Sequence, residues 1–173
     1  MLPVLETARL LLRPRSLGDL DACLAMNRNP EVMRYVGGLP EDWTAYEADL
    51  SSQISRLFPA GLGYWSLFPK QTPARFVGWV SLTPCDGADD SSAEIGWRVT
   101  REDWGNGYAT EAAGALLRHG FGTVGLERIV ATVHPGNTHS MKVARRLGMA
   151  FLGDGDYYGE PCKLFAMDRP LTG

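Results

Sequence analysis

Residues 93–112 constrain the fold and the function of this chain more than any other segment. Residues 93–99 alternate between apolar side chains and smaller or charged ones, which is the period-two pattern of a strand with two different faces. Gly105 and Gly107 interrupt this pattern, and good helix formers follow from Tyr108 onward. A loop with few side chains lets backbone N–H groups approach an anion, and the dipole of the following helix favours negative charge there. The segment therefore predicts a binding site for a phosphate or a pyrophosphate.

Two common phosphate-binding motifs do not fit this loop. A dinucleotide-binding fold needs G-x-G-x-x-G after its first strand and an acidic residue about 20 positions later, at the end of the next strand. Here Thr110 takes the place of the third glycine, and Glu127 opens the next predicted strand instead of closing it. A P-loop needs G-x-x-x-x-G-K-[ST], and no Lys-Ser or Lys-Thr pair follows a glycine in this chain. A plain strand–loop–helix connection without a ligand remains as an alternative.

The net charge narrows the class of partner, and the cysteine count narrows the cellular compartment. The 173 residues carry a formal net charge of −3 and no dense basic stretch, so nucleic acid is not an expected partner, whereas a cationic or amine-bearing molecule is. No apolar run is long enough to cross a bilayer, and no signal peptide is evident at the N-terminus. The odd number of widely spaced cysteines (Cys23, Cys85 and Cys162) fits a reducing compartment. We therefore expect a cytoplasmic protein that does not bind a membrane.

The periodicity of the whole chain predicts a single α/β domain over residues 7–170. The expected order of elements is β-α-α-α-β-β-β-α-β-α-β-β, with the middle three strands forming an antiparallel meander. The predicted strands cover residues 9–14, 63–68, 75–83, 92–100, 128–133, 151–153 and 163–168, and the last two form a hairpin around a turn at 157–159. The predicted helices cover residues 17–29, 31–36, 43–57, 108–122 and 138–147, and a capping box at Ser16 and Asp19 starts the first.

The loop resembles the acetyl-CoA motif of the GNAT superfamily of N-acetyltransferases, Q/R-x-x-G-x-G/A. Residues 104–109 read W-G-N-G-Y-A and match this motif except that Trp104 takes the Gln/Arg place. An aromatic residue is usual there in the branch that includes the bacterial ribosomal-protein N-acetyltransferases. Residues 7–14, 29–35 and 137–149 also resemble this family, so the likeness covers most of the chain. It implies a mixed, mostly antiparallel central sheet flanked by helices, with two strands splayed at the acetyl-CoA site.

The resemblance also implies how acetyl-CoA binds. The loop N–H groups suit the pyrophosphate, splayed strands would offer unpaired backbone groups to the pantetheine arm, and the family's N-x-x-S element helps to hold that arm. Lys142 and Arg145 either reach the nucleotide phosphates or lie on a solvated helix face. We expect no metal, because no group of Cys, His and Asp has ligand spacing. The residues expected to bind acetyl-CoA are Trp97, Arg98, Val99, Trp104, Gly105, Asn106, Gly107, Tyr108, Ala109, Thr110, Asn137 and Ser140.

Acetyl transfer needs a base for the amine and a proton donor for the thiolate. Glu94 is the candidate base, directly or through a water, because a related branch has its catalytic glutamate on the corresponding strand; the alternative is that Glu94 only pairs with Arg98. The usual general acid of the family is a tyrosine, but Ala144 takes its place here. Ser140 either donates the proton or only holds pantetheine. His134 either transfers a proton or caps backbone groups in its turn.

The acceptor implied by the resemblance is a primary amine, and a protein N-terminus is the first expectation. A small amine (polyamine, amino acid or aminoglycoside) and a non-catalytic acyl-CoA-binding module are the alternatives. A homodimer is compatible with the family. The residues expected near the acceptor are the aromatics Tyr35, Trp43, Tyr157 and Tyr158 and the acids Glu41, Asp42, Asp154, Asp156 and Glu160.

Overall fold

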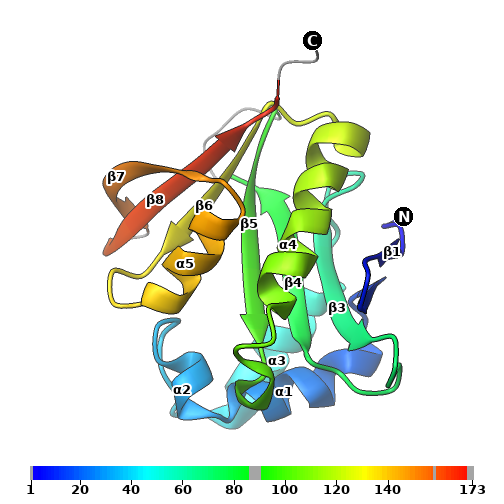
Figure 1. Ribbon diagram of the computed structural model, residues 1–173. Coiled ribbons are helices and arrows are strands. Elements are labelled where there is room, and N and C mark those ends of the chain that lie inside the picture. Colours follow the sequence, from blue (N-terminus) through cyan, green and yellow to red (C-terminus); the bar gives the residue numbers. More distant parts are fainter. Residues whose placement is uncertain (1, 86–90, 158, 171–173) are drawn as a thin grey trace.

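A computed structural model describes residues 2–85, 91–157 and 159–170, and in this part of the chain the strands form one eight-stranded sheet (Figure 1). The strand order is β1-β2-β3-β4-β5-β6-β8-β7. The strands are β1 Leu5–Glu6, β2 Leu10–Pro14, β3 Gly63–Pro69, β4 Gly78–Pro84, β5 Ser92–Val99, β6 Arg128–Val133, β7 Ala150–Tyr157 and β8 Glu160–Asp168. The α-helices are α1 Leu20–Asn27, α2 Pro30–Met33, α3 Trp43–Ser55, α4 Tyr108–His119 and α5 Thr138–Arg146. Every strand pair is antiparallel except β5 with β6, which confirms the predicted mixed, mostly antiparallel sheet.

Helices cover both faces of the sheet, with α4 and α5 on one face and α1 to α3 on the other (Figure 1). The apolar residues of α4 recur at helical spacing, so Ala112, Ala113, Leu116 and Leu117 share a face that is buried against the sheet. They join the main core, whose largest fully buried side chains include Trp65 and Phe165. Each buried leucine contributes about 1.5–3 kcal/mol to folding, so this face anchors α4 firmly. A smaller apolar cluster lies under the other helices and includes Cys23, Leu24 and Leu50.

The parallel pair β5 and β6 separates after three residue pairs. Ser92 lies opposite Arg128, and the pairing ends where Glu94 lies opposite Val130. Beyond that point β5 stays bonded to β4 and β6 stays bonded to β8, and the two strands diverge visibly in Figure 1. The open edge of β5 therefore runs from Ile95 toward the loop that precedes α4. This is the splayed arrangement predicted from the sequence.

Several boundaries differ from the predicted ones for local reasons. β1 has two residues, too few to show any periodicity. β4 begins at Gly78 instead of residue 75, because residues 69–75 make turn bonds such as Arg75 N–H to the Thr72 carbonyl. β7 is longer than residues 151–153: it is an exposed edge strand with a register shift at residues 151–153, and its Asp and Gly residues are typical of turns.

The helix boundaries shift as well. α2 ends at Met33, and α4 ends at His119, where one π-helical turn (Gly120–Val124) replaces its expected last turn. Among the described residues, no helix combines the length and the apolar character needed to cross a membrane. The predicted turn residue Tyr158 lies outside the described residues.

Candidate active site

The loop before α4 leaves backbone N–H groups open. Gly105 and Gly107 have φ values of +82° and +78°, a left-handed conformation that glycine adopts without strain. Gly107 is the N-cap of α4 and contributes no side-chain bond, and the first helical bond runs from Glu111 N–H to the Gly107 carbonyl at 3.0 Å. The N–H groups of residues 108–110 precede that bond, so they have no acceptor within the helix. These groups can bind an anion, as the sequence predicts.

A buried carboxylate fixes the turn that leads into this loop. Asp103 is 4% exposed and lies in the 3-10 turn Arg101–Asp103. Its two oxygens accept hydrogen bonds from the Arg75 guanidinium at 2.8 and 2.9 Å, and the Thr100 hydroxyl donates to it at 2.6 Å. The hydrogen bond to Asp103 raises the pKa of Arg75 above its ordinary value. The sequence did not predict this anchor, which ties the loop to the connection between β3 and β4.

Trp104, in the Gln/Arg place of the motif, bonds to the edge of β5. Its indole N–H donates to the Val99 carbonyl at 2.9 Å, and its ring lies 6.2 Å from the ring of His139 on α5. The Thr100 N–H donates to the Val77 carbonyl, so the backbone groups of Thr100 face β4. Backbone N–H and C=O groups point to alternate sides along a strand, so those of Arg98 also face β4 and those of Trp97 and Val99 face the open edge. The open edge therefore presents Trp97 and the Val99 N–H. The expectation that Arg98 and the Val99 carbonyl are free there is wrong.

Glu94 lies at the point where β5 and β6 part. The Thr132 hydroxyl on β6 donates to its Oε1 at 2.5 Å, and the Tyr157 hydroxyl on β7 donates to its Oε2 at 3.2 Å. Arg98, on the same face of β5, instead donates to Asn27 Oδ1 at 3.0 Å. The pairing of Glu94 with Arg98 is therefore not formed. Sequence reasoning missed Thr132, although a polar residue between two apolar ones on a buried strand is a usable signal.

The N-terminus of α5 faces the same gap. The Asn137 side chain is its N-cap and accepts the Ser140 N–H at 3.1 Å. Ala144, in the usual tyrosine place, is fully buried in the main core. His134 Nδ1 accepts the Gly136 N–H at 3.0 Å, so a neutral ring carries its proton on Nε2. His134 thus has the turn-capping role that was one of its two alternatives.

The expected acceptor residues divide into two groups. Tyr35 lies against His134, with ring centroids 5.0 Å apart, and Tyr157 reaches Glu94 from the last hairpin. In contrast, Asp42 caps α3 by accepting two backbone N–H groups, and Trp43 packs edge-on against Tyr46. The structure therefore brings the first pair to the gap and uses the second pair within the helical layer.

Three further kinds of group bear on the chemistry of the site: the buried thiols, two basic residues of α5 and possible metal ligands. Burial raises the pKa of the Cys23 thiol to about 11, and burial followed by the charges of Asp156, Glu94 and Asp154 raises that of Cys162, so neither thiol is an activated nucleophile. Lys142 and Arg145 lie exposed on α5. Within residues 2–85, 91–157 and 159–170, no group of three His, Cys, Asp or Glu side chains could hold a metal ion.

Comparison with known proteins identifies the family. Residues 9–150 match the acetyltransferase (GNAT) domain. The chain is 33% identical to the uncharacterized N-acetyltransferase p20 of Bacillus licheniformis over 83% of its own length and 80% of that protein's. It is 31% identical to the FsC-acetyl coenzyme A-N(2)-transacetylase of Aspergillus fumigatus, over 87% of this chain and 64% of that one.

Solved structures agree with this result. An acetyltransferase from Agrobacterium tumefaciens superposes with a TM-score of 0.80 at 27% identity, and the match covers 96% of this chain and 95% of that one. A GNAT-family acetyltransferase from Bacillus anthracis superposes with a TM-score of 0.79 at 26% identity, over 96% and 99% of the two chains. The chain therefore belongs to the GNAT family and is an acetyltransferase.

Proposed function

We propose that this acetyltransferase moves the acetyl group of acetyl-CoA directly to a primary amine, with Glu94 as the base. One observation carries the proposal: the strands β5 and β6 part at Glu94, and the open edge of β5 leads to the bare N–H groups at the start of α4. The pyrophosphate binds to these N–H groups, and the pantetheine arm lies along Trp97 and Val99. Asn137 and Ser140 support the arm from α5. This arrangement brings the thioester close to the Glu94 carboxylate.

The chemistry requires no covalent enzyme intermediate. The amine attacks the thioester carbonyl, its proton passes to Glu94 directly or through a water, and the C–S bond breaks. The CoA thiolate then takes a proton from Ser140 or from a water that the Ser140 hydroxyl positions. Thr132 and Tyr157 hold the two oxygens of Glu94 in place through their hydrogen bonds. Orientation of the two reactants adds to the rate independently of proton transfer.

A protein N-terminal amine is the acceptor we propose, with a small polyamine as the second candidate. Support for a cationic acceptor comes from the last hairpin, where, besides burial, the charges of Asp156 and Glu94 both help to raise the pKa of Cys162, while Asp154 is already paired with Lys163. The name of the Aspergillus relative, an N(2)-transacetylase that uses acetyl coenzyme A, supports nitrogen as the acceptor atom. The buried Cys23 and Cys162 form no disulfide, which supports a cytoplasmic location.

Two measurements test the proposal together. Acetyl-CoA at 100 times its Kd should raise the free energy of unfolding by about 2.7 kcal/mol, which thermal unfolding detects. Release of CoA thiol should then depend on an added amine, in a panel containing N-terminal peptides, spermidine and free amino acids. Peptide turnover with an unblocked N-terminus, and none with the N-acetylated peptide, is the expected result. Stabilisation by acetyl-CoA without thiol release from any amine would instead indicate a non-catalytic binding module.

A further inference from the structure

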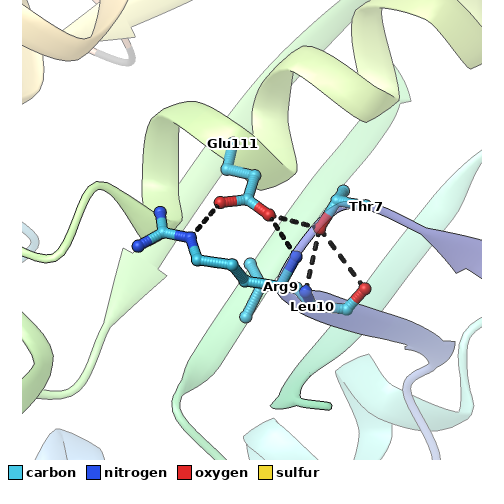
Figure 2. Close-up of polar contacts among 4 residues, drawn as sticks. All are labelled: Thr7, Arg9, Leu10 and Glu111. Atoms are coloured by element: carbon cyan, nitrogen blue, oxygen red, sulfur yellow. Dashed lines mark hydrogen bonds and ion pairs between the residues drawn. The ribbon is translucent and has the colours of Figure 1, made fainter. Parts of the chain in front are cut away.

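A polar cluster ties the first turn of α4 to the start of β2 (Figure 2). Glu111 Oε1 accepts the Thr7 hydroxyl at 2.6 Å and the Arg9 backbone N–H at 2.8 Å, and its Oε2 accepts Arg9 Nε at 2.6 Å. The Thr7 hydroxyl also accepts the Leu10 N–H at 2.9 Å. Burial acts to raise the pKa of Glu111, but the hydrogen bonds from Thr7 and Arg9 outweigh it and hold that pKa below its ordinary value. Glu111 is therefore ionised at neutral pH and fixes the Arg9 side chain.

The free end of Arg9 lies beside the phosphate loop. A Cβ built on Gly107 would lie 3.4 Å from Arg9 Nη2, and the guanidinium carbon lies 5.0 Å from the centroid of the Tyr108 ring. Figure 2 shows the two terminal nitrogens directed away from Glu111. The Arg9 side chain is 51% exposed, and the contacts found in the described chain use its Nε and its backbone N–H. Both terminal nitrogens are therefore available to a ligand at the loop.

The loop itself carries no cationic side chain. Residues 104–110 read W-G-N-G-Y-A-T, with Trp104 where the family motif has Gln or Arg. The indole of Trp104 is already bonded to the Val99 carbonyl. The ionised Glu111 carboxylate would repel a phosphate near the first turn of α4, unless a cation offsets it. Arg9 is the cation that the fold places at this position.

We infer that Arg9 is a phosphate-binding residue of the acetyl-CoA site and that Glu111 positions it. This inference rests on the proposed function, because it assigns a ligand atom at the same site. A guanidinium held at Nε presents its two terminal nitrogens in a planar fork that matches two phosphate oxygens. The pyrophosphate is thus bound by backbone N–H groups from α4 on one side and by the side chain of Arg9, which directly precedes β2, on the other.

The test compares two acetyl donors with and without phosphate. Arg9→Met should lower kcat/KM for acetyl-CoA about 10- to 100-fold, because a hydrogen bond to a charged group is lost. The same variant should keep kcat/KM for S-acetylpantetheine, which lacks every phosphate. Calorimetry should show a matching fall in the affinity for CoA, independently of turnover. An equal loss with both donors, or no loss with either, would overturn the inference.

Arg13→Met is the matched control. Arg13 lies on β2, four residues after Arg9, with a similar exposed fraction, 48%, and it pairs with Asp19 instead of Glu111. Its loss should leave the affinity for CoA unchanged. Arg9→Lys keeps the charge but not the planar fork, and it replaces the Met variant if that variant fails to fold. A partial loss of kcat/KM that is confined to acetyl-CoA supports the inference. An unchanged affinity for CoA contradicts it. If the wild-type chain binds no CoA, the proposed function fails; if it binds CoA and the Arg9 variants bind equally well, the role of Arg9 alone fails.

Discussion

Replacement of Glu94 by Gln is expected to lower kcat by about 10²- to 10⁴-fold, which is the usual contribution of a positioned general base. The amide has nearly the same shape as the carboxylate: its oxygen can still accept the Thr132 hydroxyl, and its NH2 group can donate to the oxygen of the Tyr157 hydroxyl, which itself donates to the second carboxylate oxygen of Glu94. It cannot take a proton from the attacking amine. The affinity for CoA should stay the same, because the phosphate loop and the open edge of β5 are untouched. Steady-state thiol release gives kcat, and calorimetry gives the Kd.

Glu160→Gln is the control for this change. Glu160 lies exposed on the last hairpin, so its loss removes one negative charge from the acceptor side without touching Glu94. The Glu160→Gln variant should have an altered KM for a cationic acceptor, and its kcat should change less than its KM. An unchanged kcat in the Glu94→Gln variant would contradict the assignment of Glu94 as the base. Catalysis would then come from orientation of the reactants and from bound water.

The sequence predicts those parts of the fold and site that rest on local patterns. The alternation along β5, the helical spacing on α4 and the glycines between them were enough to predict this strand, this helix and the open N–H groups between them, whereas the splayed edge was implied by the resemblance to the GNAT family. Edge strands lack this signal: β7 is exposed on both faces and contains Asp154 and Asp156, which are typical of turns. Its extent depends on pairing with β8, which is a tertiary effect.

The polar contacts that position the site were not predictable for a different reason. Thr132 lies 38 residues from Glu94, and Thr7 lies 104 residues from Glu111. Period and spacing indicate which face a residue occupies, but they do not indicate its partner on another element. The side to which the Arg98 backbone groups point was not predicted, because it depends on the register between β4 and β5. The hydrogen bond between the Thr100 N–H and the Val77 carbonyl, which fixes that register, is known only from the structure.

Replacement of Gly78 by Ala is expected to cost about 3 to 5 kcal/mol of folding free energy, among the largest effects of a single methyl group. Gly78 has a φ of +144°, and a Cβ there would lie 2.2 Å from the Arg98 carbonyl oxygen and 2.8 Å from the Val99 Cα. These are backbone atoms of the paired strand, so no side-chain rotation relieves the overlap. Either β4 and β5 separate locally or the residue changes its backbone conformation. Urea unfolding, with the slope compared between variants, measures the loss.

Gly37→Ala isolates the part of this cost that comes from the backbone alone. Gly37 has a φ of +100°, and no atom lies within 4 Å of a Cβ built on it, so only conformational strain of about 1–3 kcal/mol is expected. The additional loss of folding free energy in Gly78→Ala, compared with Gly37→Ala, then measures the cost of the close approach of β4 and β5. That approach also sets the position of Val99, and with it the open edge to which Trp104 is bonded. If Gly78→Ala costs no more than Gly37→Ala, the tight packing of β4 against β5 is not what positions this edge.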